Sequence, residues 1–415
     1  MPTDSSPSKE PSIRSSRPIP ITLEERTLLI DVVRGFALFG VLLANMVWLS
    51  QEIALTSEQL SKLPTAGIDR ISRYFVQFFI DGKFVTLFSF LFGLGFSVQL
   101  SRAESRNASI VPVYMRRLFI LLCFGLMHAY LLWYGDILVF YALLGFALIL
   151  FRLRSDRTLI TWGLILAILV PVLVLAIRSK TEMTSPAVKA VRLAAFTKGT
   201  YLDVFPENAK INASFWLKGI FLFTLPHIFG KFLLGFYAGR RHLLQNAREN
   251  LRFFRRLMWL GLAIGLICNS AWVLIANVKL FDDSSPWLVA SHFSEFTGMV
   301  ALAAFYLSAL TLLFQRATWK RNLLWLAPVG RMALTNYLMQ SVINLFLFYG
   351  YGFALMGKIG TTCCVLISII VFALQIVLSN WWLSQFHFGP LEWLWRSLTY
   401  WKPQTMKRES ISSKA

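Results

Sequence analysis

Long apolar segments separated by short polar gaps dominate this sequence and constrain its fold more than any other feature. A helix that crosses the hydrocarbon of a bilayer needs about 20 apolar residues, and its backbone polar groups must pair internally. Ten segments meet this requirement, namely 29–50, 84–100, 115–134, 136–152, 158–178, 216–239, 255–277, 288–314, 323–348 and 360–380. The sequence therefore predicts an all-α, polytopic transmembrane helix bundle of about ten spans.

The composition agrees with a bilayer as the solvent. Hydrophobic residues make up 56% of the 415 residues and charged residues only 15%, a balance that water-soluble folds do not show. The 36 Phe and 14 Trp are typical of side chains that face lipid tails and the headgroup boundary. We therefore expect membrane lipids to be its main surroundings.

The net charge of +20 can indicate nucleic acid, but the basic residues fall in the short gaps between apolar segments. That distribution is typical of loops that face anionic headgroups, so we predict no nucleic-acid partner. The four cysteines lie inside apolar segments without metal-type spacing, and we predict no metal site. The sequence indicates no particular oligomeric state.

The basic residues also predict an orientation. They are concentrated after the second, fourth, sixth and eighth spans: Arg102, Arg106, Arg116, Arg117, Arg152, Arg154, Arg157, Arg240, Arg241, Arg248, Arg252, Arg255, Arg256, Arg316, Lys320 and Arg321. By the positive-inside rule these loops are cytoplasmic, so both termini are cytoplasmic and the 179–215 loop is extracytoplasmic. We therefore expect a multi-pass membrane protein whose two ends face the cytoplasm.

The regions that flank the bundle differ from it. Residues 1–28 are rich in Ser, Pro and charge and lack a signal-peptide core, which predicts a disordered cytoplasmic tail. The transmembrane bundle then occupies residues 29–380. In 381–415, Gly389 and Pro390 end one helix, and Glu392 and Arg396 are i,i+4 partners on the next. This last region is predicted to be a cytoplasmic interfacial helix and tail.

Two Gly-x-x-x-Gly spacings, Gly235 to Gly239 and Gly261 to Gly265, allow close approach of helix backbones. We interpret them as intramolecular packing sites and not as dimerisation motifs.

Ionisable residues inside spans are costly and therefore need a partner or a function. Asp31 and Arg34 lie three residues apart at the start of the first span, and Asn45 follows deeper on the same helical stripe. They form either a self-neutralising pair at the interface or a site for an anion or donor. Asp81 either caps the second span or belongs to a binding site, in which its neighbour Lys83 would meet an anionic acceptor.

His128 and Asp136 flank the hairpin between the third and fourth spans. A histidine there can move protons, and a nearby carboxylate would fix its tautomer, although it can also be a purely structural hydrogen-bonding group. Arg331 and Asn336 lie in the ninth span. An arginine there typically holds a carboxylate or phosphate, and Asp31 is a candidate partner.

Five motifs in order along the chain resemble the YeiB-like family of bacterial inner-membrane proteins, which has no established activity. They are Asp31-x-x-Arg34-Gly35, Asp81-Gly82-Lys83, Gly125-x-x-His128 with Gly135-Asp136, Gly330-Arg331 with Asn336, and Gly389-Pro390-x-Glu392 with Arg396. The first motif also resembles a broader superfamily of transmembrane acyltransferases. That resemblance implies transfer of an acyl group from a cytoplasmic thioester donor to an acceptor at or beyond the membrane.

Three functions are consistent with these residues. As an acyltransferase, the protein would use His128 and Asp136 as catalytic residues, with no tightly bound cofactor, acyl-CoA as co-substrate and a lipid or sugar acceptor. The candidate substrate-binding residues are Asp31, Arg34, Asn45, Asp81, Lys83, Arg331, Asn336, Glu392 and Arg396. The alternatives are a transporter or permease for a small anion or lipid, and a non-catalytic membrane scaffold or sensor.

Overall fold

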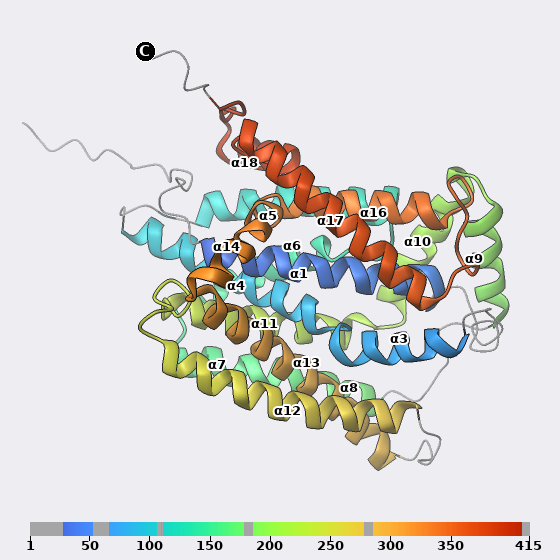
Figure 1. The fold of residues 1–415 in the computed structure, drawn as a ribbon, viewed down its shortest axis with the longest axis horizontal. Helices are drawn as coiled ribbons and strands as arrows, with labels where there is room; N and C mark the ends of the chain where they lie inside the picture. The colour runs from blue at the N-terminus through green and yellow to red at the C-terminus, as the bar shows by residue number, and fades with distance from the viewer. Residues whose placement is uncertain are drawn as a thin grey trace, which may run out of the picture.

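The computed structural model describes residues 28–52, 66–105, 109, 111–177, 186–277 and 285–408. These residues form helices, and the nearest approach to a strand among them is a single bridge between Phe386 and Lys407. The predicted tail lies outside the described residues, apart from Leu28. The prediction of an all-α helix bundle is confirmed (Figure 1).

Within the described residues, eight helical segments are long and apolar enough to cross a membrane. They are Leu28–Ser50, Gly67–Glu104, Val111–Leu132, Asp156–Ile177, Phe221–Arg240, Leu251–Asn277, Pro286–Phe314 and Thr361–Gln385. The predicted spans 136–152 and 323–348 contain the shorter apolar helices α6 (Leu138–Leu150) and α16 (Ala333–Phe348). All ten predicted segments are therefore helical.

Breaks inside the long segments divide them into shorter elements. In chain order the first are α1 (Leu28–Val47), η1 (Trp48–Glu52), α3 (Ala66–Phe79), α4 (Lys83–Glu104), α5 (Val111–Met127), η2 (His128–Leu132), α7 (Asp156–Leu164), η3 (Ile165–Leu169) and α8 (Val170–Ile177). The remainder are α9 (Pro186–Lys198), α10 (Tyr201–Leu217), α11 (Phe221–Arg240), α12 (Leu251–Asn277), α13 (Ser285–Phe314), α14 (Ala317–Leu323), η4 (Leu324–Leu326), α15 (Ala327–Arg331), α17 (Thr361–Gln385) and α18 (Pro390–Tyr400). The elements η1, η2 and η3 are π-helical turns.

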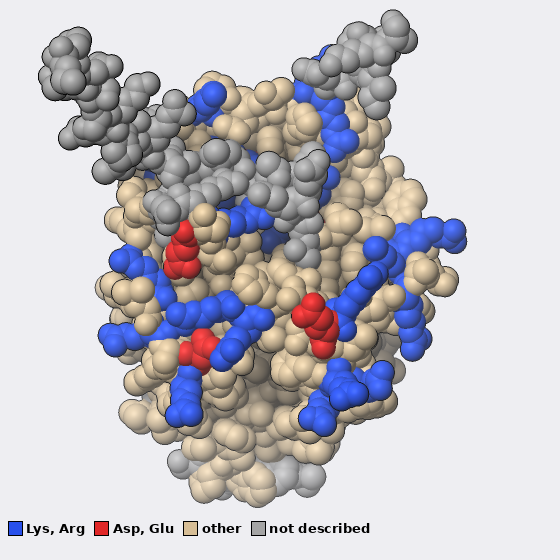
Figure 2. Space-filling view, turned by 90° about the vertical axis from the view of Figure 1, so that its left-hand side faces the viewer, with Lys and Arg blue, Asp and Glu red and all other residues tan. Residues whose placement is uncertain are grey.

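The long helices run along a common axis, and the chain begins at α1 and finishes at α18 on the same end of the bundle (Figure 1). Lys and Arg gather on this end and Asp and Glu are few, as Figure 2 shows. We call it the basic end. The helices α9 and α10, which form most of the 179–215 region, lie at the opposite end (Figure 1). Assignment of the basic end to the cytoplasm stays a prediction.

Large apolar side chains remain exposed along the outer helices, as expected where lipid replaces water. Ile267 on α12 is 69% exposed and Ile370 on α17 is 60% exposed. Exposed apolar side chains on helices that are long enough to span a membrane agree with a bilayer as their surroundings.

Glycines set the closest helix contacts inside the bundle. A Cβ atom built at Gly235 of α11 would lie 1.8 Å from the Phe90 carbonyl oxygen of α4. One built at Gly261 of α12 would lie 2.7 Å from the Ala301 carbonyl oxygen of α13. Both Gly-x-x-x-Gly spacings therefore serve packing within the chain, as predicted.

Candidate functional site

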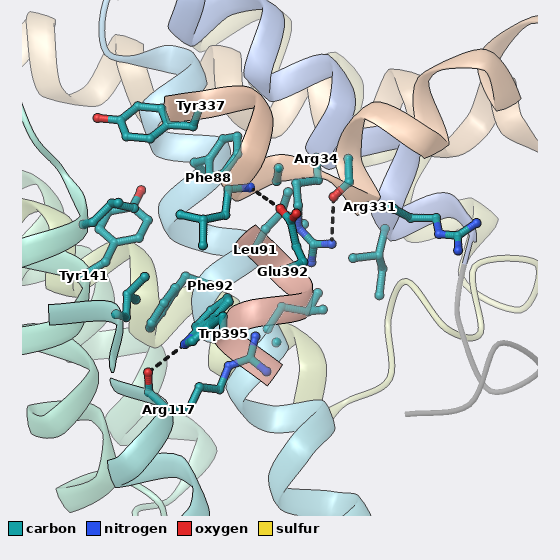
Figure 3. A pocket seen from close by; sticks show the side chains of 18 of the residues that line it. Arg34, Phe88, Leu91, Phe92, Arg117, Tyr141, Arg331, Tyr337, Glu392 and Trp395 are labelled. Atoms are coloured by element: carbon teal, nitrogen blue, oxygen red, sulfur yellow. Dashed lines mark hydrogen bonds between the residues drawn. The ribbon is translucent and has the colours of Figure 1, made fainter. Parts of the chain in front are cut away.

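A cavity of about 290 Å³ lies between α1, α4, α5, α6, α15, α16 and α18. This is roughly the share of liquid volume that ten water molecules occupy. Phe88, Leu91 and Phe92 of α4 form an apolar stretch of its wall, and Figure 3 shows Tyr337 and Tyr141 on one side of it and Arg331 on the other. The cavity thus has room for a small amphiphile and presents both apolar and charged walls.

Arginines outnumber carboxylates among the residues that line this cavity. The arginines are Arg34, Arg102, Arg117, Arg331 and Arg396, and the carboxylates are Asp31 and Glu392. Arginine is the side chain best suited to bidentate binding of phosphate or carboxylate groups. The cavity therefore has the charge that an anionic ligand requires.

The first motif of the sequence holds one wall of the cavity. Asp31 is buried and pairs with Arg34 at 3.0 Å, and Arg34 also donates to the Gly330 carbonyl at 3.5 Å. A Cβ atom at Gly330 would lie 1.9 Å from the Asp31 carbonyl oxygen, and one at Gly35 would lie 2.2 Å from that of Leu326. Glycine at both positions lets α1 touch η4 and α15, which places Arg34 and Arg331 at one cavity.

Glu392 of α18 anchors the start of α16. Its carboxylate accepts from the backbone amides of Leu334 at 2.6 Å and Thr335 at 3.0 Å, and from the Thr335 hydroxyl at 2.6 Å. Free amides at a helix start favour such an acceptor. Burial nevertheless raises the pKa of the Glu392 carboxyl. Glu392 therefore positions α16 as well as lining the cavity.

The helix α18 lines the cavity at the basic end of the bundle. The indole nitrogen of Trp395 donates to the Arg117 carbonyl at 2.9 Å, and the Arg117 guanidinium lies 3.9 Å from the Trp395 ring centroid. Arg396 lies over the Phe388 ring at 4.6 Å, and Arg331 donates to the His387 carbonyl at 3.3 Å. The predicted interfacial helix thus packs onto α5 and contributes cavity-lining residues (Figure 3).

The predicted pair of His128 and Asp136 is formed, and a third residue joins it. His128 Nδ1 lies 2.8 Å from Asp136 Oδ1, and His128 Nε2 lies 2.8 Å from the hydroxyl oxygen of Ser341 on α16. His128 is 1% exposed, Ser341 2% and Asp136 6%. Carboxylate, imidazole and hydroxyl therefore form a buried hydrogen-bonded series in that order.

This series lies directly behind the cavity wall. Ile137 and Leu138, which follow Asp136, line the cavity, and so does Tyr337, one turn before Ser341 on α16. The Tyr337 and His128 rings are 5.2 Å apart between centroids. A ligand in the cavity is separated from the imidazole by the Tyr337 side chain.

Side chains of α10 form hydrogen bonds to the π-helical turn that begins at His128. Its widened hydrogen-bonding pattern leaves carbonyls to be satisfied from outside. Tyr201 donates to the Leu131 carbonyl at 2.7 Å, Asn208 to that of Leu132 at 3.1 Å and Asn212 to that of Ala129 at 3.0 Å. Asp136 is fixed separately, because its second oxygen accepts from the Val139 amide at 2.6 Å.

Four of the nine predicted substrate-binding residues do not line the cavity: Asn45, Asp81, Lys83 and Asn336. Asn45 is half-buried on α1, and Asp81 lies in the turn before α4. Lys83 is fully buried, donates to the Gln77 carbonyl at 2.7 Å and lies 4.9 Å from the Trp272 ring centroid. Asn336 donates to the Val329 carbonyl at 3.2 Å and the Ser379 hydroxyl at 3.0 Å.

Sequence reasoning missed Ser341 and Tyr337, and it counted Arg102 and Arg117 only as loop charges. A signal for Ser341 exists in the ninth span, where it stands beside Gln340 in a row of polar residues. Four polar residues within nine positions of an apolar helix indicate a face that meets other polar groups.

The fold and the cavity define this chain as a multi-pass membrane protein with an amphiphilic cavity among its helices. Residues 238–402 match a family described as a protein of unknown function, DUF418. The chain is 34% identical over 411 residues to the uncharacterized protein YxaH of Bacillus subtilis (strain 168), which covers 94% of this chain and 98% of that relative.

It is also 30% identical over 401 residues to the uncharacterized protein YeiB of Escherichia coli (strain K12), covering 90% of this chain and 96% of YeiB. A protein of Bacillus acidopullulyticus, described as an uncharacterized 39.9 kDa protein in the amylase 3' region, is 29% identical over 394 residues, 94% of this chain and 99% of that relative. The chain belongs to the DUF418 family, together with YeiB, and the resemblance carried by its motifs is confirmed.

Proposed function

We propose that the protein is an acyltransferase of the bacterial cytoplasmic membrane, which moves an acyl group from an anionic thioester donor to an acceptor hydroxyl or amine. The observation that carries this proposal is the buried His128–Asp136 pair, 2.8 Å between Nδ1 and Oδ1, directly behind the wall of an arginine-lined cavity. A proton acceptor next to a site for an anionic amphiphile is what acyl transfer needs.

The lining of the cavity has the chemistry to meet both parts of an acyl thioester such as acyl-CoA, of which a volume of about 290 Å³ admits a portion. The cavity-lining arginines complement the phosphates of the donor, and the apolar side chains of α4 accept its acyl chain. A free metabolite without an apolar part would leave the apolar wall unused. An amphiphilic anion is therefore the substrate class that the lining favours.

The His128–Asp136 pair supplies the base. In the neutral tautomer that donates its Nδ1 proton to Asp136, Nε2 of His128 carries the lone pair that can take a proton from an attacking hydroxyl or amine. The carboxylate also stabilises the imidazolium that forms during the transfer. A lipid or sugar acceptor is consistent with this chemistry.

The test is release of free thiol by purified protein in nanodiscs, supplied with acetyl-, octanoyl- and palmitoyl-CoA and a panel of lipid and sugar acceptors. We expect His128→Gln to lower the rate about 100-fold or more. His292→Gln is the matched control, because His292 also pairs with a carboxylate, Glu295 at 3.2 Å, but lies away from the cavity.

Two results would contradict the proposal. One is thiol release by His128→Gln at the wild-type rate. The other is no thiol release by wild type across the panel, and in that case counterflow of the labelled donor in proteoliposomes would indicate a transporter.

A further inference from the structure

We infer that Ser341 is the nucleophile of this site and carries the acyl group as a covalent ester between two half-reactions. The inference rests on the proposed function and deepens it, because direct transfer to the acceptor requires only His128 and Asp136. What carries it is the position of the Ser341 hydroxyl, 2.8 Å from His128 Nε2 and on the side of the ring opposite to Asp136.

The hydrogen-bond directions support an activated hydroxyl. With Asp136 accepting the Nδ1 proton, Nε2 is an acceptor and the Ser341 hydroxyl is its donor. The competing acceptor for that proton is the Tyr337 carbonyl one turn back, at the much longer distance of 3.4 Å. A serine that only satisfied its own helix would show the opposite preference, as Ser368 does at 2.7 Å from the Cys364 carbonyl.

The position of the series between two regions explains why a covalent intermediate is useful. The His128 ring lies 5.2 Å between centroids from the ring of Tyr337, which belongs to the cavity wall. It also lies 6.4 Å from the ring of Trp133, which does not line the cavity and packs with Trp48 and Tyr134. An acyl-serine lets donor and acceptor approach the same atom at different times, so the two need not occupy one cavity together.

The chemistry balances without another reactant. Ser341 Oγ attacks the thioester carbonyl carbon while its proton moves to His128 Nε2, the C–S bond breaks, and the departing thiolate takes that proton. In the second half, the acceptor hydroxyl or amine attacks the seryl ester, its proton passes to His128, and the proton returns to Ser341 Oγ as the ester C–O bond breaks. The donor reaches Ser341 only if Tyr337 rotates, since Ser341 follows it by about 6 Å along α16.

The experiment is trapping of the intermediate. Full-length protein in nanodiscs is incubated with acyl-CoA of the three chain lengths and no acceptor, quenched in acid, and analysed by intact mass and peptide mapping. We expect one acyl group on the peptide that contains Ser341 in wild type and none in Ser341→Ala, which also loses turnover about 100-fold or more. Ser368→Ala, a buried serine on α17, keeps the adduct.

A second variant separates a chemical role from a structural one. Ser341→Cys should also be acylated, with the adduct now a thioester that neutral hydroxylamine releases while the wild-type ester persists. Thermal melting in detergent checks that each variant is folded.

The outcomes distinguish the two levels of the proposal. If Ser341→Ala keeps normal turnover while His128→Gln loses it, Ser341 is not the nucleophile, but the proposed acyltransferase function is still supported. An acyl adduct on any other residue also contradicts the role of Ser341 as the nucleophile. Absence of thiol release in wild type contradicts both that role and the acyltransferase function.

Discussion

At the level of single residues, the placement of the arginines bears on how a bundle of apolar helices would hold the anionic donor proposed above. Arg34 and Arg117 lie in the first two turns of α1 and α5, and each guanidinium has a neighbour that supports it. Arg34 forms an ion pair with Asp31, and Arg117 lies over the Trp395 ring. Local support fixes the direction of a long side chain before any ligand arrives, which reduces the entropy lost on binding.

Removing one of these guanidinium groups should weaken donor binding. We expect Arg117→Gln to raise the Kd for palmitoyl-CoA about 10-fold or more, because a hydrogen bond to a charged group contributes about 1.5 kcal/mol or more. Arg157→Gln, an exposed arginine at the same basic end that does not line the cavity, is the control. Isothermal titration in nanodiscs measures both, and an equal loss in the two variants would contradict a specific contact.

The site could be predicted only where its residues are close in the sequence. His128 and Asp136 are eight residues apart, so one hairpin predicts that they meet, and the structure places them at 2.8 Å. Ser341 is 213 residues from His128, and no spacing or periodicity links them. Its place beside the imidazole depends on how α16 packs against the π-helical turn, which a single sequence does not contain.

Among whole elements, helix positions could be predicted better than helix breaks. The length of the apolar segments predicted all ten helical regions. It did not predict the π-helical turns η2 and η3, because an apolar sequence is compatible with both α-helix and π-helix. The prediction that α18 lies at the surface omitted its packing onto α5, for a similar reason. Its amphipathic pattern indicates an apolar face, and the pattern alone does not distinguish lipid from the side of α5 as the partner of that face.

The contact between α1 and α15 offers a test at this scale. We expect Gly330→Ala to lower the free energy of unfolding by about 1–3 kcal/mol or more, because its Cβ would overlap the Asp31 carbonyl. Gly67→Ala on α3 is the matched control, since nothing lies within 4 Å of a Cβ there. Melting temperatures in detergent compare the two, and an unchanged Gly330→Ala protein would refute the close contact.

The molecule as a whole shows a clear charge asymmetry between its ends, and that asymmetry predicts its orientation. We expect a cysteine at Lys210, on α10, to react with a membrane-impermeant maleimide in intact cells. A cysteine at Arg248, in the basic loop after α11, should react only after the membrane is permeabilised. Lys210 has a 68% exposed side chain, so access does not limit its labelling. The reverse pattern would place the basic end outside.

The fastening of the π-helical turn by α10 has a mechanical consequence. Three side chains of α10 hold the carbonyls of the turn that carries His128, and α10 lies at the end of the bundle far from the basic loops. A displacement of α10 relative to this turn would break those bonds and remove the support of the segment that carries His128. We therefore expect a shift of α10 to change the position of the His128 ring, and amide hydrogen exchange over 129–132, measured with and without a candidate ligand, tests that coupling.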